Sequence, residues 1–99
     1  MKKFNDLVFE NHPNGMGGFQ ARMDFPNGFG VSVVCGQFFY CSPKKNLPDA
    51  SMYHTYEVAI VEGGSLTYDT PITDDVLGYL KPTEVTDVMG QVQSLVENI

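Results

Sequence analysis

The 99-residue sequence is poor in basic residues and cysteine, and it has no long apolar run. Six lysines and arginines stand against twelve aspartates and glutamates, which gives a formal net charge of −6. Proteins that bind nucleic acid directly need basic surface to displace counterions from phosphates, so this charge argues against that class. A membrane-spanning helix needs about 18 consecutive apolar residues, and no such stretch occurs. The composition instead permits a partner protein with a basic surface.

The two cysteines, Cys35 and Cys41, are too few for a disulfide framework or a zinc site. We expect both to be buried free thiols. The N-terminus starts with lysines, as a signal peptide does, but Asn5, Asp6 and Glu10 interrupt the place of its apolar segment. These features predict a protein of the cytoplasm, where thiols stay reduced.

Enough apolar material is present for one hydrophobic core. Hydrophobic residues make up 42% of the chain, and they include seven phenylalanines. The length predicts a single domain over residues 1–99, without repeats or linkers. A chain this short buries only about 60–65% of its unfolded surface, so modest stability is expected unless it forms a homo-oligomer.

The order of the patterns, with strands first and helices last, predicts an α+β fold. We expect an antiparallel sheet of four to five strands, a short helix, and a C-terminal amphipathic helix packed on one face. Polar residues and two prolines mark 43–52 as a loop, and residues 37–42 either continue a strand or begin a new one. The expected strands are short segments with alternating or apolar patterns, at 19–25, 29–35, 56–63 and 65–69.

The loop between the first two of these strands allows their register to be derived. A two-residue turn at Asn27 and Gly28 would place Phe25 opposite Gly30 and mix polar with apolar residues on both faces. A three-residue loop, with Gly28 in the left-handed conformation, places Phe25 opposite Phe29 and sorts the faces. The second register is therefore predicted.

Two helices are predicted in the last third of the chain. Thr73 is a good N-cap, and Asp74 and Asp75 would lie in the first turn, where the helix dipole favours negative charge; this short helix would end at Gly78 or Pro82. The final helix is expected to begin near Thr83. Its apolar stripe consists of Val85, Val88, Met89, Val92, Leu95, Val96 and Ile99, and its polar side carries Glu84, Asp87, Gln91 and Glu97.

The glycine-rich segment 12–18 raises the question of phosphate binding. A phosphate loop places its glycines between a strand and a helix, whereas the segment after Gly18 alternates like a strand, and no lysine follows at the P-loop spacing. The pattern favours a flexible connection between two strands. The alternative is a mobile loop that closes on a ligand or partner, with Met16 at its tip.

Other candidate chemistry is sparse. His12 and His54 have no third group in the sequence that would orient a Cys–His pair. Asp69, Asp74 and Asp75 could gather a divalent cation, but helix capping explains the last two without a metal. We therefore predict no catalytic residue, no metal and no cofactor.

The densest aromatic cluster lies at Phe38, Phe39 and Tyr40, and alternation places some of these rings on the solvent side. Exposed aromatic patches are typical of binding surfaces, while packing on both faces is the alternative. Acidic groups would speed association with a basic partner. The predicted partner-binding residues are Met16, Phe38, Phe39, Tyr40, Asp74, Asp75, Glu84 and Asp87.

Three stretches resemble a group of small proteins of tailed bacteriophages and prophages. They are "HPNGMGGFQARMDFPNGFGVSVV", "YEVAIV" with "YDTPITDDVLGYL", and the closing "EVTDVMGQVQSL". The resemblance covers most of the chain, with 43–52 as a variable insertion, and it carries over no catalytic residue. It implies a small acidic protein in the cytoplasm of the infected bacterial host, where such proteins often block a host factor.

The resemblance leads to two functional hypotheses. The first is a phage accessory protein that binds and inhibits a host protein, as an anti-defence factor such as an inhibitor of a CRISPR or restriction effector. The alternative is a non-enzymatic sponge for a nucleotide signal, an oligomer with a pocket near 12–18 and with Arg22, Lys44 or Lys45 as basic groups. An enzyme ranks third, because the sequence has no nucleophile–base pair and no metal-ligand spacing.

Overall fold

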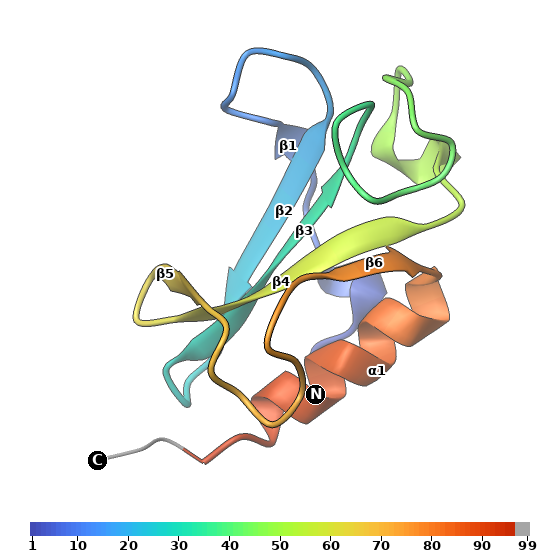
Figure 1. Ribbon diagram of the computed structural model, residues 1–99. Helices are drawn as coiled ribbons and strands as arrows, with labels where there is room; N and C mark the ends of the chain where they lie inside the picture. Colours follow the sequence, from blue (N-terminus) through green and yellow to red (C-terminus); the bar gives the residue numbers. More distant parts are fainter. Residues whose placement is uncertain (97–99) are drawn as a thin grey trace.

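A six-stranded antiparallel sheet with one helix across one face forms the framework of the computed structural model, which describes residues 1–96 (Figure 1). The strand order is β1-β2-β3-β4-β5, and β6 pairs with the other part of the same β4 edge. The elements are the 3-10 turn Phe4–Asp6, β1 Glu10–Asn11, β2 Phe19–Asp24, β3 Phe29–Cys35, the 3-10 turn Ala50–Met52, β4 Tyr56–Glu62, β5 Ser65–Thr67, β6 Leu77–Leu80 and α1 Pro82–Gln93. The predicted α+β class is confirmed.

The register predicted for the β2–β3 hairpin is confirmed. The Phe25 N–H donates to the Phe29 carbonyl at 2.7 Å, and Met23 lies opposite Val31. Gly28 has a φ of 88°, the left-handed conformation that the three-residue loop requires. This register brings the apolar side chains of both strands, except Val34, to one face, and a shift by one residue would separate the two sets.

The core lies between that face and α1. Val85, Val88, Met89 and Val92 are buried on the helix, as the stripe predicted. Val96, however, is 85% exposed, because the helix ends at Gln93 and the stripe no longer faces the sheet. Leu95 is partly buried against the core, whereas Glu97 and Ile99 lie outside the described residues.

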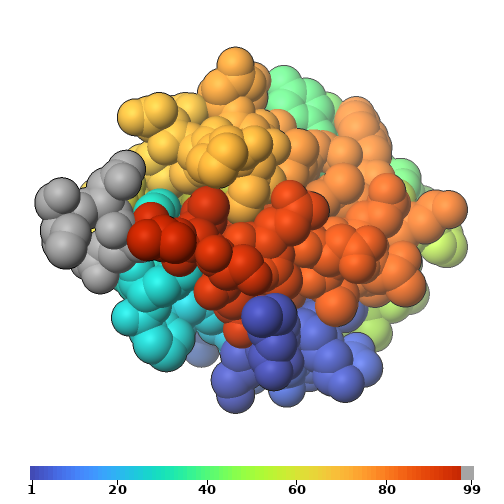
Figure 2. Space-filling view, turned by 90° about the horizontal axis from the view of Figure 1, so that it is seen from below, coloured from blue at the N-terminus to red at the C-terminus, as the bar shows by residue number. Residues whose placement is uncertain are grey.

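The N-terminal residues pack against a side of α1 that the sheet does not cover. Lys2 and Gln93 exchange two hydrogen bonds of 2.8 Å, and the Phe4 N–H donates to Thr86 Oγ1 at 3.0 Å. Seen from below, this segment lies beside α1 and the β2–β3 turn (Figure 2). It thereby covers helix surface that the sheet alone would leave exposed.

The short helix predicted from Thr73 is wrong. The Thr73 hydroxyl instead accepts from the Asp75 N–H at 3.1 Å and donates to the Asp75 carbonyl at 2.9 Å, which makes a turn. The chain then enters β6, where Leu77 and Leu80 pair with β4 and pack against the core. Pairing with a buried strand outweighs local helix-capping preference here, and it adds a strand to the four to five expected.

The segment 36–41 neither continues β3 nor begins a strand, since it forms turns before a single bridge between Ser42 and Thr55. Residues 43–52 form the predicted loop and include the 3-10 turn Ala50–Met52. Within residues 1–96, no helix has the length and apolar character needed to cross a bilayer.

Candidate functional site

A β-bulge in β6 gives one residue an unusual backbone conformation. Between the pairs Tyr56–Leu80 and Val58–Leu77, β4 contributes Glu57 alone, whereas β6 contributes Gly78 and Tyr79. Tyr79 has a φ of 58°, and within residues 1–96 no other non-glycine residue has a positive φ. Such a conformation costs about 1 kcal/mol or more, and it persists only where the surrounding structure enforces it.

Contacts with Tyr40 enforce this conformation. The Tyr79 N–H donates to the Tyr40 carbonyl at 2.9 Å, which joins the 36–41 turns to β6. A Cβ on Gly78 would lie only 2.7 Å from the Cβ of Tyr40, so glycine is required at the closest approach. The two tyrosine rings have centroids 6.2 Å apart and planes inclined by 48°.

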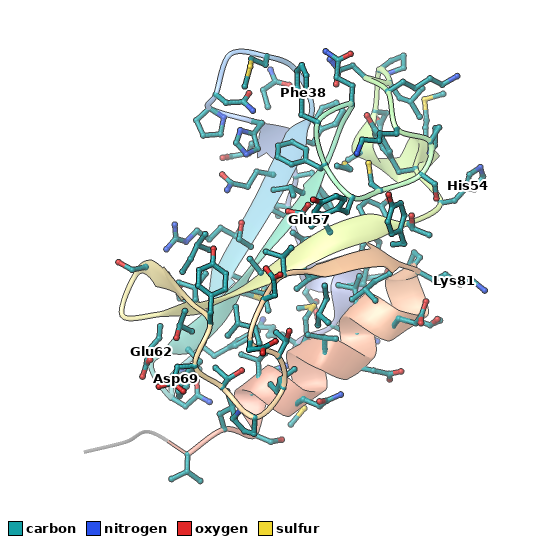
Figure 3. The ribbon with its side chains drawn as sticks, viewed as in Figure 1. Phe38, His54, Glu57, Glu62, Asp69 and Lys81 are labelled. Carbon is teal, nitrogen blue, oxygen red and sulfur yellow. The ribbon has the colours of Figure 1, made fainter. Side chains whose placement is uncertain are left out.

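The two rings form an exposed surface, which we call the tyrosine surface and define as Tyr40, Tyr79 and Lys44. Tyr40 is 51% exposed and Tyr79 is 54% exposed. The Lys44 ammonium lies 5.0 Å from the centre of the Tyr40 ring, a distance at which the ring face attracts a cation. The Tyr40 N–H donates to Glu57 Oε1 at 3.0 Å, and Figure 3 shows Glu57 projecting from β4 toward the 36–41 turns. Both tyrosines are thus held by backbone contacts and offer their rings to solvent.

The side chain of Asn46 connects the glycine-rich loop 12–18 to the 36–41 turns. Asn46 Nδ2 donates to the Met16 carbonyl at 3.1 Å, and Asn46 Oδ1 accepts from the Gln37 N–H at 3.0 Å. The loops that carry Met16 and Phe38 are therefore connected, and they lie at the same end of the sheet (Figure 1). Both side chains are exposed. Phe39 is partly buried and lies against His12, with ring centroids 5.0 Å apart.

The four acidic residues predicted to bind a partner, Asp74, Asp75, Glu84 and Asp87, are exposed. Two of them already have structural roles. Asp75 Oδ1 accepts from the Val76 N–H at 2.7 Å, and Glu84 Oε1 accepts from the Lys81 N–H at 3.0 Å, which caps α1. Within the described part of the chain, no contact joins these carboxylates to the tyrosine surface.

Sequence reasoning missed Tyr79 because a short helix, ending at Gly78 or Pro82, was predicted here and not a strand. The available signal was Gly78, since a glycine inside a strand pattern often marks a bulge or a close backbone approach. Its neighbour then becomes the side chain that the bulge redirects.

The glycine-rich segment has a structural role. Gly15, Gly17 and Gly18 have φ values of 74°, 86° and 87°, and the segment joins β1 to β2. A Cβ on Gly17 would collide with the Asn46 side chain, and one on Gly18 would lie 2.6 Å from the Cys35 carbonyl. These glycines therefore permit a bend and a close approach, as a strand-to-strand connection requires.

The hollow beside this loop lacks the basic groups that a nucleotide needs. Its volume is about 460 Å³, and no lysine or arginine occurs among the residues of the described chain that line it. Arg22 instead donates to the Gly64 carbonyl, and Lys44 lies over Tyr40. This arrangement gives no support to the nucleotide sponge.

Nucleophiles and metal ligands are also poorly placed. Cys35 and Cys41 are free thiols and are buried, as predicted. Burial, reinforced by the neighbouring Cys41, raises the pKa of the Cys35 thiol to about 12, which suppresses the reactive thiolate. In residues 1–96, no three histidine, cysteine, aspartate or glutamate side chains gather as metal ligands, so the group formed by Asp69, Asp74 and Asp75 is not present.

Comparisons with known proteins do not assign the chain to a family. No family model matches the chain, and no curated protein or solved structure is significantly similar to it.

Proposed function

We propose that this chain is a small, non-enzymatic bacteriophage protein that binds and inhibits a protein of the bacterial host, as an anti-defence factor such as an inhibitor of a CRISPR or restriction effector. The tyrosine surface is its main contact. The phage context rests on the resemblance of its sequence motifs, and the binding role rests on the surface itself.

The observation that carries the binding role is the strained Tyr79. A left-handed tyrosine lowers the stability of the fold, and glycine would fit the same backbone without that cost. Strain kept at an exposed aromatic residue is typical of a functional position, because stability is traded for a ring in the right place. Tyrosine is also among the residues that contribute most to binding energy at protein interfaces.

Charge indicates the kind of partner. The chain carries a net charge of −6, so a basic surface would be attracted and a nucleic acid repelled. Lys44 places its ammonium over the Tyr40 ring, so this ring face is suited to a cation. A lysine or arginine of a host protein could replace Lys44 there.

The test compares Tyr79→Gly with Tyr68→Ala as baits in a bacterial lysate, followed by calorimetry with the protein recovered by the unmutated chain. Tyr68 is an exposed tyrosine beyond β5, so its loss is a matched control. We expect Tyr79→Gly to raise the melting temperature and yet to weaken binding about tenfold or more. Tyr68→Ala should bind like the unmutated chain.

Two outcomes would contradict the proposal. Equal recovery of the same protein by the Tyr79→Gly bait would remove the tyrosine surface from the interface. The melting temperature of the unmutated chain is also measured with mono-, di- and cyclic nucleotides. A ligand at 100 times its dissociation constant raises the free energy of unfolding by about 2.7 kcal/mol, so a clear rise in melting temperature would favour the nucleotide sponge instead.

A further inference from the structure

The outer edge of β2 has backbone groups without partners. The Phe25 N–H bonds to β3, and hydrogen bonding alternates along an antiparallel strand, so Met23 and Ala21 also bond to β3. The N–H and C=O groups of Arg22 and Asp24 therefore point away from β3. β1 pairs only with Phe19 and Gln20, and no backbone partner reaches Arg22 or Asp24 from within residues 1–96.

The free edge has defined ends and room beside it. It runs over residues 21–25, because β1 occupies Gln20 at one end and Pro26, which has no N–H, begins the turn at the other. A hollow of about 620 Å³ lies beside its second half, lined by Met23, Asp24, Phe25 and Pro26 and by the N-terminal residues. This hollow separates the backbone of this part of the edge from the N-terminal residues.

The sequence of this edge is complementary to itself. In an antiparallel pair centred on Met23, Arg22 lies opposite Asp24 of the second copy, and Asp24 lies opposite the second copy's Arg22. Registers centred on Arg22 or Asp24 would place like charges opposite each other, which is unfavourable. In the single chain the guanidinium bonds to the Gly64 carbonyl, and in the pair it exchanges that bond for the stronger, charge-assisted bond to the Asp24 carboxylate of the second copy.

We propose that the β2 edge binds a second copy of this chain in a two-fold antiparallel pair centred on Met23. Arg22 and Asp24 of each copy contribute backbone hydrogen bonds and two ion pairs across the symmetry axis. The contact is short, so the dimer is weak and depends on concentration. It joins the two sheets into one continuous sheet.

Charge exchange tests the register. Sedimentation equilibrium of the unmutated chain should show a mass that rises from 11.0 kDa toward twice that value as the concentration approaches about 1 mM. Arg22→Asp and Asp24→Arg should each raise the dissociation constant of the dimer about tenfold or more, because each places like charges across the axis. An equimolar mixture of the two variants should recover the dimer, because both carboxylates of one variant then face the guanidinium groups of the other.

Controls separate this contact from a general effect of charge. Lys45→Asp and Asp87→Arg make the same charge changes on other exposed surfaces, and both should associate like the unmutated chain. The amide protons of Arg22 and Asp24 should exchange more slowly as concentration rises, while those of Ala21 and Met23 should not change. A mass that stays at one chain, or a mixture of folded variants that fails to associate, would overturn the proposal and leave the edge for a strand of another protein.

Discussion

Burial keeps several ionisable side chains of this protein in their neutral, unreactive forms. Cys35 lies on the core face of β3 and is fully buried, and Cys41 Sγ donates to the Gly36 carbonyl at 3.2 Å. Tyr56 is buried beside them, and its hydroxyl donates to the Ala50 carbonyl at 2.6 Å. Burial raises the pKa of both thiols and of the Tyr56 phenol. These groups therefore stabilise the fold in their neutral forms.

Replacing Cys35 by serine should destabilise the protein by about 1–3 kcal/mol, because a buried hydroxyl loses its hydrogen bonds to water. Urea unfolding of the Cys35→Ser variant measures this change. The melting temperature of the unmutated chain should be the same with and without reductant, since both thiols are free. A melting temperature that falls on reduction would contradict the assignment.

Stability should also fall at alkaline pH. The Cys35 pKa is raised from 9.0 to about 12 in the folded chain, so between these values the unfolded chain releases a proton that the folded chain retains. The free energy of unfolding must then decrease as pH rises. Urea titrations from about pH 8 to about pH 11 should show this decrease, and Cys35→Ala should make it shallower. Identical slopes for the two proteins would exclude Cys35 as a cause.

At the scale of the elements, one turn residue ties the hairpin to the helix. Asn27 Nδ2 donates to the carbonyls of Val92 at 2.9 Å and Leu95 at 3.0 Å, while its Oδ1 accepts from the Phe29 N–H at 3.1 Å. The last carbonyls of a helix have no partner within the helix. The β2–β3 turn therefore supplies the C-terminal cap of α1.

Substitution of Asn27 should separate its two roles. Asn27→Ala should cost about 1–2 kcal/mol, because helix carbonyls lose their donor. Asn27→Asp keeps the acceptor for Phe29 but places a negative charge against carbonyls at the negative end of the helix dipole, so it should cost more at neutral pH than Asn27→Ala. Urea unfolding checks this order. Equal stability of the two variants at neutral pH would argue against a role for the amide donor.

For the whole molecule, the strand order separates the two proposed contacts. The β2 edge lies at one side of the sheet and β6 pairs at the other, with β3 and β4 between them. Self-association therefore leaves Tyr40 and Tyr79 accessible. A dimer would present two tyrosine surfaces to host proteins, which increases the effective affinity for a partner that is itself repeated.

Binding to the host partner should weaken with salt, since the chain carries a net charge of −6. We expect Tyr40→Ala to reduce affinity more than any single acidic substitution, because a desolvated ring contributes more than an exposed charge. Calorimetry of Tyr40→Ala and of the combined Asp74→Asn, Asp75→Asn variant measures both effects. If neither folded variant changes the affinity, the 43–52 loop, with Lys44 and Lys45, becomes the next candidate.

Sequence by itself determined the β2–β3 register and the buried stripe of α1, because each depends on a periodic pattern that only one arrangement can bury. The same reasoning failed at 73–80, where Thr73 and two aspartates resemble a helix start. Only the tertiary structure decided that Leu77–Leu80 adds to β4, that Tyr40 holds Tyr79 in a strained conformation, and that Asn27 caps a helix 65 residues further along the chain. These features depend on groups distant in sequence, whose pairing no local pattern encodes.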